Sequence, residues 1–266
     1  MRTLFKRSVL LGGALGTFKL NCDSRWRRPA AAEAEKTKYY RGYSRAQVTG
    51  AIDHSVLKPN SPPSEILQAA DVAIKLKNAS LCIRPVDVVA AASRLAGSAI
   101  PVCTVIGFPH GTSTTATKVF ETKDACRGGA TEIDMVVNVA ALVSGDYNLA
   151  QEDIQAVVAA AHAHGAIVKV ILETCLLTND QIKTGCLLAE KAGADFVKTS
   201  TGFGAAGATV EHVKLMRAAV GSRLQVKASG GIRSLDQLAD LLDAGADRCG
   251  CSATEAIVQE FDAKSF

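Results

Sequence analysis

The sequence is poor in aromatic residues: Phe, Trp and Tyr make up 5% of the 266 residues, although 48% of the chain is hydrophobic. An interior of this composition is built from Ala, Val, Leu and Ile, the residues that fill buried parallel strands. The chain also lacks a long apolar run near its start. The stretch at residues 9–18 is short and contains three glycines, which argues against a membrane-spanning helix.

None of the eight cysteines belongs to a C-x-x-C pair, and most of them lie in apolar runs. In a chain of this size without a clear secretory signal, this pattern predicts buried free thiols rather than disulfides. His162 and His164 stand two residues apart on an expected helix, so their side chains face different directions and make a poor metal pair. We therefore expect no metal site.

Acidic residues are nearly absent from the first 32 residues, which carry seven Lys or Arg and one Asp, a net charge of +6. Because the whole chain carries +4, the remainder is −2, and its charge gives no indication of nucleic-acid binding. We expect residues 1–40 to be a basic N-terminal extension and residues 41–266 to form one domain. If this extension carries no targeting signal, the protein is expected to be cytoplasmic. The alternatives are an organellar transit peptide and a secretory signal.

Short apolar runs alternate with alanine-rich amphipathic stretches from about residue 46 onward. We predict eight strands, at residues 51–57, 80–83, 102–106, 132–138, 168–172, 196–198, 225–228 and 248–251. The predicted helices lie at residues 63–77, 85–96, 114–128, 149–164, 178–192, 210–220 and 234–244. Several are followed by glycine, as at Gly129 and Gly193, which is a common signal for a helix end.

Eight strands that alternate with helices over roughly 220 residues predict an α/β fold, a single (β/α)8 TIM barrel. An open, doubly wound sheet is the alternative, but it usually carries a glycine-rich phosphate loop after its first strand. Here Lys58, Pro59 and Asn60 follow the first expected strand, and glycine-rich turns follow the sixth and seventh strands instead. A phosphate site formed late in the chain is typical of barrels.

Two lysines lie in similar surroundings on adjacent expected strands. Lys198 and Lys227 each follow a valine and precede small and hydroxyl-bearing residues, and Asp134 lies within another expected strand. Two ammonium groups in one pocket repel each other, which favours the neutral amine of one of them. A neutral lysine is a nucleophile that forms a Schiff base with a carbonyl compound, and a nearby carboxylate compensates charge and relays protons.

Other polar residues also stand where strands are expected to end, and in a barrel the active site lies at that face. They are Asp53, Cys82, Asn138, Lys169, Glu173, Thr199, Ser200 and Ser252. The position of Lys169 is ambiguous, because a lysine flanked by two valines can also extend outward along the barrel surface.

A phosphate site is predicted from the late glycines. Gly230 and Gly231 are expected to open a helix with free backbone N–H groups. Gly202 lets the backbone approach a ligand closely, and Ser252 supplies a hydroxyl. Together these residues favour a phosphorylated carbonyl compound as substrate.

The body of the chain resembles deoxyribose-phosphate aldolase, a family of class I aldolases. Six segments carry the resemblance over about residues 46–258, namely IDHSVLKP (52–59), VIGFPHG (105–111), EIDMVVN (132–138), KVILETCLL (169–177), FVKTSTGF (196–203) and VKASGGIR (226–233). The resemblance implies reversible cleavage of 2-deoxy-D-ribose 5-phosphate to D-glyceraldehyde 3-phosphate and acetaldehyde, in deoxyribose phosphate catabolism. It implies no metal and no organic cofactor.

The resemblance also implies roles for particular residues. Lys198 would be the Schiff-base lysine, Lys227 the neighbouring cation that favours its neutral form, and Asp134 a proton relay. Gly202, Gly230, Gly231 and Ser252 would contact the phosphate. The implied partners are a small sugar phosphate and an aldehyde, with no nucleic acid and no membrane; a homodimer stays open.

The chain departs from the family pattern in two places. Some members end in a tyrosine-bearing tail that assists proton transfer, whereas this chain ends Phe-Asp-Ala-Lys-Ser-Phe at residues 261–266. Some members also have a lysine where Phe203 stands and a second serine where Ala253 stands. The first departure bears on the proton step, and the second on phosphate affinity.

Two other functions remain open from the residues. One is a Schiff-base aldolase or transaldolase that acts on another sugar phosphate, because it would share the barrel and the lysine. The other is a non-catalytic barrel that serves as a binding scaffold. A binding scaffold is expected to have lost the lysine or the aspartate of the site, and this sequence retains both.

Overall fold

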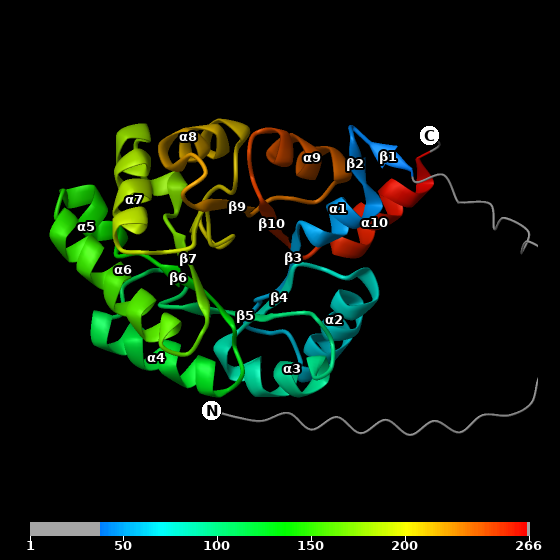
Figure 1. Cartoon of the computed structure of the whole chain (residues 1–266), viewed down its shortest axis with the longest axis horizontal. Helices are drawn as coiled ribbons and strands as arrows, with labels where there is room; N and C mark the ends of the chain where they lie inside the picture. The colour runs from blue at the N-terminus through cyan, green and yellow to red at the C-terminus, as the bar shows by residue number, and fades with distance from the viewer. Residues whose placement is uncertain (1–37, 265–266) are drawn as a thin grey trace, which may run out of the picture. The chain divides into compact units, whose positions relative to one another are not determined.

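A closed barrel of eight parallel strands forms the centre of the molecule in the computed structural model, which describes residues 38–264. The strands pair in the order β10-β3-β4-β5-β6-β7-β8-β9, and the pairing of β10 with β3 closes the ring. Helices surround the ring (Figure 1). The predicted (β/α)8 barrel is confirmed, and the closure excludes the open doubly wound sheet.

The eight barrel strands are short, and nearly all of their residues are buried, which explains their continuous apolar pattern. They are β3 (Ile52–Val56), β4 (Ser80–Ile83), β5 (Val102–Ile106), β6 (Glu132–Val136), β7 (Ile167–Ile171), β8 (Phe196–Lys198), β9 (Gln225–Ser229) and β10 (Arg248–Cys251). Each predicted strand is present, within two residues at either end.

The helices begin at capping residues that the sequence supplies. Thr178 and Ser234 each form a capping box with a glutamine three residues later, and Pro63 begins its helix at the first position, where proline is favoured. The helices are α1 (Arg45–Gly50), α2 (Pro63–Leu76), α3 (Val88–Leu95), α4 (Thr115–Arg127), α5 (Val139–Ser144), α6 (Tyr147–His162), α7 (Asn179–Lys191), α8 (Val210–Val220), α9 (Leu235–Asp243) and α10 (Thr254–Ala263).

Several elements differ from the sequence-based expectation. The helix predicted at residues 85–96 divides into a 3₁₀ turn, Pro85–Asp87, and α3. Asn138 lies beyond the end of β6, and its side chain caps α5, a helix that the sequence analysis did not predict. The hairpin of β1 (Tyr39–Tyr40) and β2 (Tyr43–Ser44), together with α1 and α10, was also missed, and the hairpin spans the predicted boundary at residues 40 and 41.

Strand register places the charged residues of the late strands beside one another. Asp134 on β6 is level with Lys169 on β7, Lys198 on β8 with Lys227 on β9, and Lys227 with Arg248 on β10. Side chains alternate between the two faces along a strand, so residues that are level on neighbouring strands point to the same face. The charged side chains of these level pairs point into the barrel. Within residues 38–264, no helix is both long and apolar enough to cross a membrane.

Candidate active site

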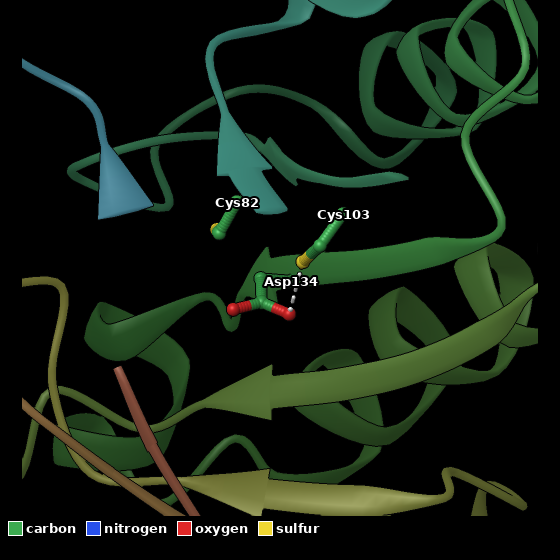
Figure 2. A group of neighbouring side chains, drawn as sticks. All are labelled: Cys82, Cys103 and Asp134. Carbon is green, nitrogen blue, oxygen red and sulfur yellow. Dashed lines mark hydrogen bonds between the residues drawn. The ribbon is translucent and has the colours of Figure 1, made fainter. Parts of the chain in front are cut away.

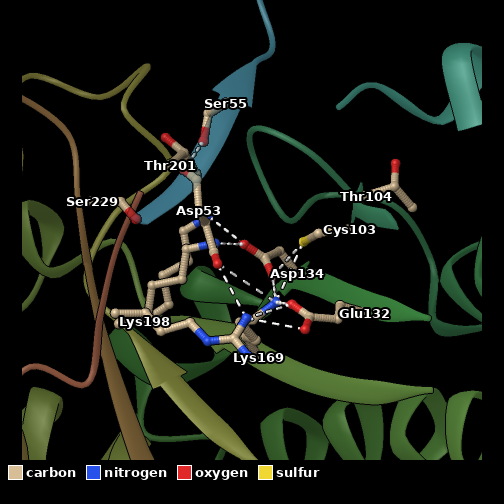
Figure 3. A network of polar contacts seen from close by, with 12 residues as sticks. Asp53, Ser55, Cys103, Thr104, Glu132, Asp134, Lys169, Lys198, Thr201 and Ser229 are labelled. Carbon is tan, nitrogen blue, oxygen red and sulfur yellow. Dashed lines mark hydrogen bonds and ion pairs between the residues drawn. The ribbon is translucent and has the colours of Figure 1, made fainter. Parts of the chain in front are cut away.

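The carboxylate of Asp134 lies at the centre of three lysines (Figure 3). The Nζ atoms of Lys198 and Lys227 each lie 2.7 Å from the same oxygen, Oδ2 of Asp134. The Nζ atom of Lys169 lies 2.8 Å from the other oxygen, Oδ1. The structure therefore brings the predicted trio of Asp134, Lys198 and Lys227 into direct contact, and it places Lys169 inside the barrel rather than outward.

The three lysines differ in how many carboxylates they contact. Lys227 also lies 2.5 Å from Oδ2 of Asp53, and Lys169 also lies 2.6 Å from Oε2 of Glu132. Lys198 has Asp134 as its one carboxylate within 4.0 Å in the described part of the chain, and it shares that oxygen with Lys227. Its ammonium form is therefore the least compensated of the three.

The electrostatics of this cluster follow from burial and close charges. Burial acts to raise the pKa of Asp134, but the three surrounding lysines hold it well below its usual range. Burial acts to lower the pKa of Lys227, but Asp134 and Asp53 raise it above the ordinary lysine value. The pKa of Lys169 is also raised above the ordinary lysine value, chiefly by Asp134, although burial acts to lower it. These directions make Asp134 an anion and Lys227 and Lys169 cations in the resting site.

A cavity of about 360 Å³ opens above Lys198. It is lined by Lys198 together with the four residues predicted to contact a phosphate, Gly202, Gly230, Gly231 and Ser252. Lys227 and Asp134 are fully buried beneath it: Asp134 contacts Lys198 directly, and Lys227 contacts Asp134.

The expectation that Gly230 and Gly231 open a helix is wrong. Both have positive φ angles, +87° and +81°, and α9 begins only at Leu235, behind its cap Ser234. A right-handed helix cannot start on residues of positive φ. The two glycines that line the cavity therefore belong to a loop, and a loop of this kind can hold an anion as a nest of amides.

The loop after β8 is held in place by Glu173. Both the backbone N–H and the hydroxyl of Thr201 donate hydrogen bonds to its carboxylate, and the N–H of Phe203 donates to the Thr201 hydroxyl. Glu173 itself has a positive φ of +55°, an uncommon conformation for a non-glycine residue. These bonds fix Gly202 at the wall of the cavity.

Sequence reasoning missed several residues around the site. Lys58 and Arg233 line the cavity, and the guanidinium of Arg84 donates to the carbonyls of Lys58, Pro59 and Ser61. Glu132 and Arg248 were also missed. Alternation along β6 could have found Glu132, because it stands two residues before Asp134 and so faces the same side.

Two cysteines and the central carboxylate of the site form a group of possible metal ligands (Figure 2). Ligand atoms of Cys82, Cys103 and Asp134 lie within 4.8 Å of one another. The thiol of Cys103 donates to Asp134 at 3.1 Å, and burial raises the pKa of this thiol well above its ordinary value. Three lysines already surround the carboxylate, so a metal cation would meet strong repulsion here.

The fold and the site define a barrel enzyme with a buried lysine–carboxylate centre that opens onto a cavity lined by glycine-rich loops. A sequence profile of the family described as DeoC/LacD family aldolase matches residues 48–257. The chain therefore belongs to the DeoC/LacD family of aldolases, and it is an enzyme of that family. The family expected from the six sequence segments is confirmed.

Known relatives agree in sequence and in structure. The deoxyribose-phosphate aldolase of Bacillus cytotoxicus is 54% identical over 207 residues, which cover 78% of this chain and 92% of that protein. Deoxyribose-phosphate aldolase 1 of Staphylococcus aureus is 53% identical, with 80% and 96% covered. The tetrameric deoxyribose phosphate aldolase of Aeropyrum pernix superposes with a TM-score of 0.78 at 29% identity, with 83% of this chain and 93% of that chain covered.

Proposed function

We propose that this enzyme reversibly cleaves 2-deoxy-D-ribose 5-phosphate to D-glyceraldehyde 3-phosphate and acetaldehyde, with Lys198 as the Schiff-base residue. The observation that carries the proposal is that Lys198 alone of the three lysines lines the cavity, while its Nζ shares an Asp134 oxygen with Lys227. The names of relatives more than 50% identical over most of the chain support the substrate.

The chemistry begins when the neutral amine of Lys198 attacks the aldehyde carbon of the open-chain sugar and water leaves. The resulting iminium withdraws electrons, so the bond between the second and third carbons breaks. The hydroxyl on the third carbon loses its proton and becomes the aldehyde of glyceraldehyde 3-phosphate. The remaining enamine takes up a proton, and hydrolysis releases acetaldehyde and regenerates the lysine.

Asp134 and Lys227 serve the proton steps in this proposal. Asp134 is fully buried and contacts the Nζ of Lys198, so it is within reach of protons that enter and leave the reacting nitrogen. The charge of Lys227, held by Asp53 and Asp134, opposes protonation of Lys198. Lys227 keeps its charge while the iminium forms and breaks, whereas Asp134 takes up a proton and releases it again.

The phosphate lies against the loops of Gly202, Gly230 and Gly231, with the hydroxyl of Ser252 as a further donor. Lys58 and Arg233 add positive charge at the exposed rim of the same cavity. They offer cationic partners in a chain that has Phe203 where some family members have lysine. Charge-assisted hydrogen bonds of this kind contribute about 1.5–3 kcal/mol each.

Reductive trapping tests the proposal. Acetaldehyde and borohydride should fix a two-carbon adduct on the peptide that contains Lys198, as measured by peptide mass mapping. Lys198→Arg should abolish both the adduct and aldol cleavage. The matched variant Lys183→Arg, an exposed lysine on α7, should change neither. An adduct found on Lys227 or Lys169 in the unaltered enzyme would overturn the assignment.

We also propose a cytoplasmic location and a homodimer. The seven cysteines among residues 38–264 are free, which suits a reducing compartment. Val86, Val89 and Phe120 expose 82%, 65% and 67% of their surfaces, apolar area that a second copy could cover. Sedimentation equilibrium of the purified enzyme measures the oligomeric state, and a monomer at micromolar concentration would contradict the dimer.

A further inference from the structure

Seven charged side chains meet inside the barrel, and their charges do not balance when all are ionised. Within the described residues, four cations face three anions: Lys169, Lys198, Lys227 and Arg248 against Asp53, Glu132 and Asp134. Six of the seven are at least 95% buried, and the seventh, Arg248, keeps 20% of its side chain exposed. Buried charge without a partner is costly, so the cluster favours the loss of one proton from a cation.

The contacts show which cation is least compensated. Arg248 contacts both Asp53 and Glu132, at 3.1 and 2.8 Å, and a guanidinium does not release its proton in proteins. Lys169 and Lys227 each contact two carboxylates within 2.8 Å. Lys198 contacts one and is the one that lines the cavity.

We propose that Glu132 and Arg248 are positioning residues that set the protonation of Lys198 through the charge balance of this cluster. The inference rests on the proposed role of Lys198. Neither residue lines the cavity around Lys198. Arg248 is the fourth cation beside three carboxylates, so a protonated Lys198 leaves the cluster with one positive charge in excess. Glu132 neutralises part of that excess by holding Lys169 and Arg248 together.

The other groups that face the cluster are two thiols, one carboxylate and the charges at the rim of the cavity. Burial raises the pKa of the Cys103 thiol on β5 well above its ordinary value, whereas the hydrogen bond with Cys103 and the charge of Lys227 lower the pKa of the Cys82 thiol on β4. The carboxylate of Glu173 at the end of β7 is bound to Thr201. Lys58, Glu65 and Arg233 lie at the rim of the cavity, where solvent screens them.

The proposal makes predictions of opposite sign for two variants. Glu132→Gln removes a negative charge, so protonated Lys198 becomes less stable and the acid limb of the pH–activity profile moves to lower pH. Arg248→Met removes a positive charge, so the limb moves to higher pH. At an effective dielectric constant of about 20, the change of one unit charge within such a cluster shifts the limb by about one pH unit.

The experiment measures two pH profiles for each variant: kcat/KM, and the yield of the acetaldehyde adduct trapped on Lys198 by borohydride. Glu132→Asp and Arg248→Lys keep the charges and should keep the limb near its original pH. The double variant Glu132→Gln/Arg248→Met restores the net charge and should do the same. Glu190→Gln removes a carboxylate that pairs with Arg223 between α7 and the end of α8, and it is the surface control.

The outcomes separate the inference from the function on which it rests. If the unaltered enzyme gives no adduct on Lys198, the proposed function fails. If the adduct forms but both single variants leave the limb unchanged, or move it in the same direction, the charge-balance role is overturned. A purely structural role would lower yield or Tm without opposite shifts. If Glu132→Gln does not fold, the pH profile of Arg248→Met alone decides the question. An acid limb that stays at its original pH or moves to lower pH in that variant overturns the inference.

Discussion

At Gly231, both the backbone conformation and the space proposed for the ligand disfavour a side chain. Its φ angle is +81°, a Cβ atom placed there would meet no atom within 4 Å, and the residue lines the cavity beside Gly230. Any side chain would therefore be strained and would also fill space proposed for the phosphate. Gly145, which ends α5, has the same φ angle and the same free space, but it is not among the cavity residues.

This pair gives a matched test of the phosphate site. Gly231→Ala should lower kcat/KM for 2-deoxyribose 5-phosphate by about 10- to 100-fold, the loss of one charge-assisted hydrogen bond. It should leave the slow reaction of unphosphorylated 2-deoxyribose nearly unchanged. Gly145→Ala should carry a similar backbone strain without either kinetic effect. Steady-state kinetics with both sugars measures the difference, and equal losses on both sugars would contradict phosphate binding at Gly231.

At the scale of the element, strands and long helices were predictable because their patterns are local. Most barrel strands contain consecutive apolar residues that are buried, and helices such as α2 carry their own start signals. Short elements such as α5, which has six residues between Asn138 and Gly145, are too short for a periodicity to mark them. The Gly230–Gly231 loop was assigned to a helix start because no local pattern marks the positive φ angles of its two glycines. The close approach of Gly230 to the backbone of Gly207 is likewise a contact that sequence does not show.

The site was predictable to the same extent. Lys198, Lys227 and Asp134 stand out as charges within apolar runs, whereas Arg248 stands at the start of its strand, next to Asp247, and resembles a surface residue in sequence. Its contact with Glu132 joins residues 116 positions apart, on strands β10 and β6 of the ring. Pairings of that kind depend on the closure and register of the barrel, which no local pattern encodes.

The contact between β3 and α10 contains a pH-sensitive residue. The Nδ1 atom of His54 lies 2.8 Å from the hydroxyl of Thr254, and burial lowers the pKa of His54 from 6.5 to about 4. Between these two values the unfolded chain binds a proton that the folded chain does not. Folding stability is therefore lost as pH falls through this window, by roughly 3 kcal/mol for this one group.

His54→Gln should remove that part of the pH dependence, because glutamine does not titrate and can still reach Thr254. The Tm of the unaltered enzyme should fall more steeply between pH 7 and pH 4.5 than the Tm of the variant. Differential scanning calorimetry at the two pH values measures both slopes. Parallel slopes would show that His54 becomes protonated within the folded protein and would contradict the low pKa.

At the scale of the whole molecule, the described barrel domain begins with the β1–β2 hairpin. Arg41 forms ion pairs with Asp240 and Asp243 at the end of α9, and the hydroxyl of Tyr43 also donates to Asp243. Arg45 on α1 pairs with Asp262 on α10. These contacts join the start of the domain to its last two helices. The basic residues 1–32 lie outside the described residues.

A chain that begins at Thr37 should therefore keep the fold and the chemistry. Its kcat/KM should lie within about twofold of the full chain and its Tm within about 2 °C, because no residue of the cavity or the charged cluster precedes Asp53. A chain that begins at Arg45 also lacks the hairpin. Exposed ion pairs contribute little individually, so its Tm should be lower by about 1–4 °C with kcat/KM unchanged.

The salt dependence distinguishes ion pairs from packing as the cause. Solvent screens exposed charges at 1 M NaCl, so the Tm difference between the chains that begin at Thr37 and Arg45 should shrink there. Arg41→Ala in the full chain should reproduce part of the same difference at low salt. A large loss of activity in the chain that begins at Thr37 would instead mean that residues before the hairpin support the active enzyme, either by contact with the barrel or by building an interface between copies.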